Sequence, residues 1–153
     1  MDVRGTNQSI TKVDVDAVAV PVFKDESANE GVLRTLDKAV NGALSSVIKS
    51  DEFKAKEGET AYFHLTEGGL RARRILLIGC GERSEYRSQQ ISQMAGTAAR
   101  FLRSKNAKTI AIVPRAEDDV EKVSQWAISG AVMGLFEPDK YRTKDKEQRQ
   151  VER

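Results

Sequence analysis

The sequence predicts an α/β fold built on a mixed, mainly parallel sheet with helices on both faces. In the second half of the chain, apolar runs typical of strands alternate with amphipathic stretches typical of helices, and this alternation implies parallel crossovers. The run Arg74–Gly79 is apolar at each of its four inner positions, as expected of a strand that is covered by helices on both sides.

The first half of the chain contains one well-defined strand and one long helical pattern. Residues 16–23 form an apolar run that predicts a buried strand, and residues 3–10 predict an earlier, weaker strand. Ser27 and Glu30 have the spacing of a capping box, which marks the start of a helix. Apolar residues then recur at helical spacing, so we expect a helix over residues 31–49.

The second half supplies the remaining elements. Residues 59–66 alternate between apolar and polar side chains, which predicts a half-buried strand. Its short glycine-containing connection to the strand at 74–79 allows an antiparallel pair. Helical spacing predicts a helix at about 86–104 and another that begins near residue 120 and stops near Pro138, and residues 109–114 predict another buried strand between them.

Length and composition indicate one domain, at residues 1–138 of the 153. Residues 139–153 are nearly all charged or Gln, which favours an interdomain linker or a disordered tail. The net charge of +2 favours no class of charged partner. Because the N-terminus lacks an apolar signal region and no apolar run approaches about 18 residues, we expect a cytoplasmic protein with no membrane partner.

One loop is a candidate ligand site. Gly79, Cys80 and Gly81 follow the central strand, where glycines let backbone amides approach an anion. The third glycine of the dinucleotide fingerprint is absent, because Ser84 stands there, and a tight turn is the commoner role of such a pair. Cys80 is either a reactive thiol or a small buried apolar residue, and the second interpretation is favoured.

Other candidates have simpler explanations. The single cysteine excludes an internal disulfide and a cysteine-based zinc cluster, and the single histidine, His64, is better explained as a surface or partly buried residue than as a general base. Asp118 and Asp119 complement a helix dipole, while Gly130 and Gly134 predict close packing of one helix on its neighbour. No catalytic residue or metal ligand is predicted. Five arginines could form a basic patch for nucleic acid, although interleaved glutamates favour a solvated surface: Arg71, Arg73, Arg74, Arg83 and Arg87.

Several segments carry a family resemblance through their order and spacing. They are residues 16–23, 36–39 with Gly42 and Leu44, 51–59, 74–81, 130–136 and 139–144. Together they resemble the N-terminal domain of the leucine aminopeptidase (cytosol aminopeptidase) family, and residues 139–144 look like its junction between domains. The resemblance covers nearly the whole chain.

This resemblance implies a macro-domain-like fold that precedes a larger catalytic domain. In the family, the catalytic domain binds two divalent metal ions (zinc, manganese or magnesium), releases N-terminal amino acids from peptides and belongs to a homohexamer. Its ligand motif, Asn-Thr-Asp-Ala-Glu-Gly-Arg-Leu, occurs nowhere in this sequence. We therefore expect a non-catalytic domain without a cofactor of its own, which serves oligomer assembly and access to the active site of its parent enzyme.

Two alternative functions remain open at this point. A macro-like fold with the loop Gly79–Gly81 could bind ADP-ribose or another nucleotide diphosphate. The domain could instead be a DNA-binding accessory domain, as the resemblance implies for some bacterial members of the family.

Overall fold

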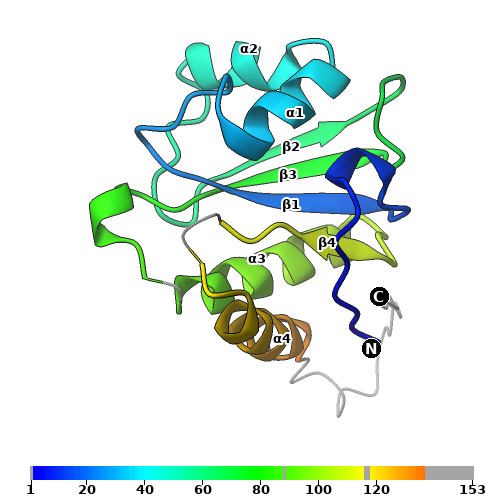
Figure 1. Ribbon diagram of the computed structural model, residues 1–153, viewed down its shortest axis with the longest axis vertical. Helices are drawn as coiled ribbons and strands as arrows, with labels where there is room; N and C mark the ends of the chain where they lie inside the picture. The colour runs from blue at the N-terminus through cyan, green and yellow to red at the C-terminus, as the bar shows by residue number, and fades with distance from the viewer. Residues whose placement is uncertain (1, 88, 116–117, 137–153) are drawn as a thin grey trace, which may run out of the picture.

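The computed structural model of the protein describes residues 2–87, 89–115 and 118–136. Four strands form one sheet in the order β2-β3-β1-β4 (Figure 1). They are β1 (Ala17–Val22), β2 (Thr60–His64), β3 (Arg74–Gly79) and β4 (Ile110–Ile112). Because β1 runs parallel to both β3 and β4 while β2 runs antiparallel to β3, the predicted mixed, mainly parallel sheet is confirmed.

Helices cover both faces of this sheet (Figure 1). Helices α1 (Gly31–Ala39) and α2 (Ala43–Lys49) cover one face, and α3 (Gln90–Ser104) covers the other. The last helix, α4 (Val120–Leu135), packs against α3. All six residues of β1 are buried, and their side chains alternate between the apolar clusters of the two faces.

Most strands and one helix lie where the sequence predicts them. The strand at 74–79 is confirmed to the residue, and the helix predicted from residue 120 is confirmed as α4, which ends at Leu135. β2 pairs antiparallel with β3, and Tyr62 packs on α3 through the ring of Phe101, with 5.5 Å between centroids. β4 is shorter than the predicted strand and only half-buried, because it lies at the edge of the sheet.

The predicted helix over residues 31–49 is wrong, because the structure divides it into α1 and α2. Asn41 (φ 55°) and Gly42 (φ 83°) adopt left-handed backbone conformations, which end one helix before the next begins. The Asp37 carboxylate accepts hydrogen bonds from the backbone N–H and the hydroxyl of Ser45, and these bonds tie the two helices together. The Asn-Gly pair is the sequence signal for this break.

Three other local predictions are wrong. No strand forms over residues 3–10, whose side chains are exposed up to a short 3₁₀ helix, η1 (Ile10–Lys12), and offer no apolar face to a sheet. The capping box does not form, because the Ser27 hydroxyl accepts from the N–H of Asn29 instead. The helix predicted from residue 86 begins at Gln90, after a 3₁₀ helix, η2 (Arg83–Glu85).

Glycines bring α3 and α4 into backbone contact. A Cβ atom on Gly130 would lie 1.9 Å from the carbonyl oxygen of Ser92, and one on Gly134 would lie 2.5 Å from that of Gly96. Neither helix backbone can move aside without disturbing the other, so only glycine fits at these two positions of α4. The close packing predicted from this pair of glycines is confirmed.

Part of the predicted domain organisation lies beyond the described residues. The linker or tail predicted at 139–153 falls outside them, so the boundary at residue 138 stays a prediction. In the part of the chain that the structure describes, no helix combines the length and the apolar character needed to cross a membrane.

We predict that Gly130→Ala lowers the free energy of unfolding by about 2 kcal/mol or more, because the added methyl group overlaps the backbone of α3. Gln125→Ala on the exposed side of the same helix is the control and should change it by less than about 0.5 kcal/mol. Urea unfolding followed by circular dichroism measures both. Equal stability of the two variants would contradict the contact.

Candidate functional site

The topology of the sheet places the natural ligand crevice at the carboxyl ends of β1 and β3. The chain leaves β1 towards α1 on one face and leaves β3 towards α3 on the opposite face. In open α/β sheets, ligands bind where adjacent strands diverge in this way. The crevice should therefore lie between Lys24, just beyond β1, and the predicted anion-binding loop Gly79–Gly81.

The backbone amides of that loop are already used within the protein. The N–H of Gly79 donates to the carbonyl of Glu59 (2.7 Å), and that of Gly81 donates to the carbonyl of Ala55 (2.9 Å). The N–H of Cys80 donates to the carbonyl of Val22 (2.8 Å). Only the short 3₁₀ helix η2 follows the loop directly, and the α-helix α3 starts at Gln90. The loop thus offers an anion neither an unused amide nor the N-terminus of an α-helix, which disfavours the anion-binding hypothesis.

Residues 53–59, which we call the strap, lie across the carboxyl end of β3. A Cβ atom on Gly79 would lie 2.0 Å from the carbonyl oxygen of Lys56, so the strap fits only above a glycine. The Glu59 carboxylate holds the strap in shape by accepting from the backbone N–H groups of Lys54 and Lys56, both at 3.0 Å. The crevice expected from the topology is therefore closed by the chain itself.

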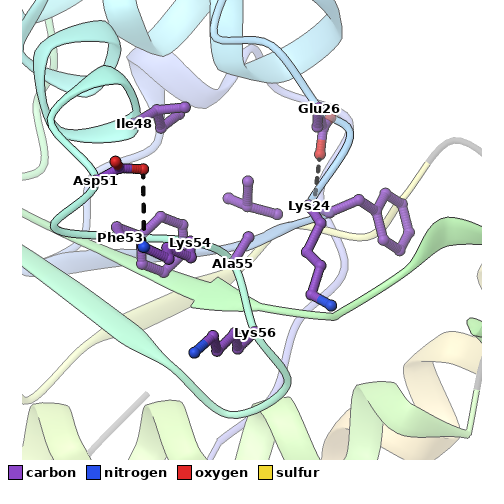
Figure 2. A pocket seen from close by; sticks show the side chains of 10 residues that line it. Lys24, Glu26, Ile48, Asp51, Phe53, Lys54, Ala55 and Lys56 are labelled. Carbon is purple, nitrogen blue, oxygen red and sulfur yellow. Dashed lines mark hydrogen bonds and ion pairs between the residues drawn. The ribbon is translucent and has the colours of Figure 1, made fainter.

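A pocket lies on each side of the strap. The first, of about 370 Å³, has an apolar floor and three lysines, Lys24, Lys54 and Lys56, around it (Figure 2). Lys24 forms an ion pair with Glu82 at 3.0 Å, and the Lys54 amine lies 4.0 Å from Asp51, so acidic groups offset two of the three charges.

The second pocket, of about 380 Å³, lies between the strap and α3. Its lining residues are Glu57, Gly58, Ile78, Gly79, Cys80, Gln90, Gln93, Met94 and Thr97. The Cys80 thiol is buried, with its Sγ 3.1 Å from the sulfur of Met94, and burial raises the pKa of this thiol to about 12. Cys80 is therefore the small buried apolar residue that the sequence favoured, and the pocket contains no activated nucleophile.

A buried ion pair fills the space beyond β1 and β4. The guanidinium of Arg115 contacts the carboxylate of Glu26, and both side chains are more than nine-tenths buried. Arg115 also donates to the carbonyl of Pro21 (2.9 Å), and Glu26 accepts from the N–H of Phe23 (3.1 Å). Each charged group thus contacts a backbone group as well as its partner. The ion pair links the segments that follow β1 and β4 and has a structural role.

Aromatic rings complete this buried cluster. Arg115 and Arg83 lie over the Phe23 ring at 4.8 and 4.4 Å, and the ring of Tyr86 meets that of Phe23 edge-on at 5.1 Å. The Tyr86 hydroxyl donates to Asp118 (3.0 Å). Burial, followed by the Asp118 charge, raises the pKa of Tyr86 well above its usual value, so the phenol stays neutral at physiological pH.

Sequence reasoning missed this cluster. Its members are isolated residues far apart in the sequence, with 89 positions between Glu26 and Arg115, and no local spacing marks them. Asp119 caps α4 as the helix-dipole interpretation predicted, by accepting from the N–H groups of Glu121 and Lys122. Asp118 has a different role, because it joins the cluster.

The remaining candidates do not converge on one site. His64 is exposed at the end of β2 and lies opposite Arg74 in the register. Arg71, Arg73 and Arg74 lie at the amino end of β3, while Arg83 and Arg87 lie beyond its carboxyl end. A strand of six residues is about 20 Å long, so the structure divides the predicted basic patch into two groups.

We predict that Glu26→Ala lowers the free energy of unfolding by about 3 kcal/mol or more, because it removes the buried carboxylate that contacts the guanidinium of Arg115. Glu82→Ala removes the exposed partner of Lys24 and should cost less than about 1 kcal/mol. Chemical denaturation measures both. A small loss for Glu26→Ala, equal to that of the control, would contradict the structural role of the buried pair.

Comparison with known proteins finds a family whose model matches this chain. The model of the cytosol aminopeptidase family, N-terminal domain, matches residues 19–145. A probable cytosol aminopeptidase of Alkaliphilus metalliredigens is 30% identical over 145 residues, which make up 93% of this chain and 29% of that protein. The chain thus spans less than a third of the length of this relative.

Solved structures show the same fold. A tomato leucine aminopeptidase mutant matches with a TM-score of 0.79 and 22% identity over 95% of this chain and 30% of that chain. The macrodomain of Mycobacterium tuberculosis DarG matches with a TM-score of 0.64 and 16% identity over 84% of this chain and 88% of that one. The macro-domain-like fold is therefore confirmed, and the family match over residues 19–145 shows that this chain belongs to the cytosol aminopeptidase family as its N-terminal domain.

Proposed function

We propose that this chain serves a metal-dependent leucine aminopeptidase as its non-catalytic N-terminal domain, while a separate catalytic domain releases N-terminal amino acids from peptides. The main support is one observation. In this chain, the strap occupies the crevice at the carboxyl ends of β1 and β3, where an open α/β sheet would bind a ligand. The strap covers Gly79, and the buried ion pair of Glu26 and Arg115 occupies the space beyond the ends of β1 and β4. A domain built in this way is suited to a structural role.

The metal ions of the family do not fit the described part of this chain. Residues 2–87, 89–115 and 118–136 contain no group of three or more His, Cys, Asp or Glu side chains that could hold a metal ion. Metal-assisted hydrolysis needs such a set of ligands, together with a water that the metal activates. We therefore assign the two divalent ions, zinc, manganese or magnesium, to the catalytic domain of the parent enzyme.

Within the parent enzyme, we assign the domain to oligomer assembly and to control of access to the active site. Its partners would be its own catalytic domain and the other subunits of a homohexamer. We place the enzyme in the cytoplasm, in keeping with the name of its relatives, cytosol aminopeptidase.

The two alternative functions have weaker support. The likeness to a macrodomain favours a nucleotide-binding module, but the amides of Gly79–Gly81 donate to carbonyl groups of the protein itself. DNA binding needs clustered cations, and the arginines around β3 form two groups at opposite ends of that strand.

The test uses the chain alone and a chimaera. With leucyl-p-nitroanilide and Mn²⁺, the chain alone should show no turnover above buffer. In the chimaera, this chain replaces the matching segment of the Alkaliphilus relative, and it should restore the oligomer and the peptidase activity that a deletion of that segment loses. The described residues of this chain include no metal-binding group, so we expect the chimaera to regain activity through assembly.

Two results would reject the proposal. The first is turnover by the chain alone that a chelator abolishes. The second is a deletion protein that assembles and cleaves the substrate as well as the chimaera does. Size-exclusion chromatography with light scattering gives the assembly state, and release of p-nitroaniline gives the activity.

A further inference from the structure

The pocket between the end of β1, α2 and the strap combines apolar side chains with lysines. Its volume of about 370 Å³ lies within the range of roughly 300–1,000 Å³ that small-molecule sites occupy. Val22, Phe53 and Ala55 line it from the core, since each is at most 4% exposed, and the half-buried Ile48 lines it from α2. An apolar group of a ligand can therefore contact several fixed side chains at once.

Three lysines surround this apolar lining. Lys24 extends from the residue that follows β1, and Lys54 and Lys56 extend from the strap on either side of Ala55 (Figure 2). Within residues 2–87, 89–115 and 118–136, the ammonium group of Lys56 has no ion-pair partner. The pocket thus places positive charge beside an apolar surface.

The acidic side chains around the pocket do not cancel this charge. Glu26 lines the pocket, but its buried carboxylate is neutralised by the guanidinium of Arg115. The side chains of Asp51 and Glu82, which pair with two of the lysines, are 87% and 50% exposed. Exposed ion pairs contribute little to stability, so an anion in the pocket can replace these two carboxylates.

The backbone of the strap has a fixed shape at this pocket. Ala55 has a φ of 50°, a left-handed conformation that residues with a Cβ atom seldom adopt. Its carbonyl accepts from the N–H of Gly81, and the Glu59 carboxylate accepts from the N–H groups of Lys54 and Lys56 on either side of it. Strained backbone that is anchored in this way is typical of functional sites. It also reduces the ordering that binding would cost.

We propose that this pocket binds a small organic anion. The apolar group of the ligand contacts Ile48 and Phe53, and its phosphate or carboxylate group lies among the ammonium groups of the three lysines. Lysine acts as a point charge towards an anion, so either kind of anionic group suits the site. The inference goes beyond the structural role proposed above and does not depend on it, because the pocket lies within this chain.

An NMR titration of the isotopically labelled chain with four probes tests the proposal. Phenyl phosphate or phenylacetate should bind with a Kd of about 1 mM or below and shift the amides of Ile48, Lys54 and Lys56. Which of the two binds more tightly distinguishes a phosphate ligand from a carboxylate ligand. Inorganic phosphate and benzyl alcohol each supply only half of the required chemistry, so both should bind at least about tenfold more weakly.

Three results of this titration overturn the proposal. The first is that neither organic anion saturates the chain up to about 20 mM. The second is that inorganic phosphate binds as tightly as the organic anions. The third is that the shifts occur at Gln93 and Thr97, which line the pocket on the other side of the strap.

Matched lysine variants locate the anionic group. Lys56→Gln should raise the Kd of the preferred organic anion about fivefold or more, because it removes one of the positive charges at the pocket. Lys38→Gln is the control and should leave the Kd unchanged. Lys38 is exposed on α1 beside Ala39, whose carbonyl accepts from the N–H of Gly69 near the opposite end of β3. Both lysines are exposed, so both variants should fold, and equal Kd values for the two variants overturn the proposal.

Discussion

At the carboxyl end of β3, the backbone of Ala55 and Lys56 lies so close to Gly79 that no side chain fits between them. This contact fixes the position of the strap and uses the amides that would otherwise face a ligand. The hydrogen bonds of the strap to β3 continue the sheet into the loop, so the closure is part of the folded core. The loss of an open crevice therefore follows from one glycine and the segment that covers it.

At the carboxyl end of the sheet, side chains of the domain itself occupy space where a ligand could otherwise bind. Arg115 and Glu26 neutralise each other in the interior, while Phe23 and Tyr86 supply the apolar and aromatic surface around them. A fold shared with a macrodomain thus has a structural core at the position where such a sheet offers a binding site. Among the residues that the structure describes, most of the exposed large apolar side chains belong to α4 and its ends.

The strands and α4 could be predicted from the sequence because their signals are local. The apolar run at 74–79 predicts β3 from its own residues, and the helical spacing of apolar residues over 120–135 does the same for α4. The break at Asn41-Gly42 was missed because the apolar period continues across it, although the pair itself favours left-handed backbone. The Glu26–Arg115 pair was beyond prediction, since it exists only once the fold joins distant segments. The same applies to the amides of Gly79 and Gly81, whose acceptors lie in the strap.

Hydrogen exchange measured by NMR tests the closed crevice most directly. The amides of Gly79, Cys80 and Gly81 donate to carbonyl groups in the folded core, so they should exchange as slowly as those of Leu76 and Leu77 inside β3. Addition of ADP-ribose should leave their resonances unchanged. Rapid exchange of these three amides, or a ligand-induced shift confined to them, would show an open anion-binding loop and contradict the account.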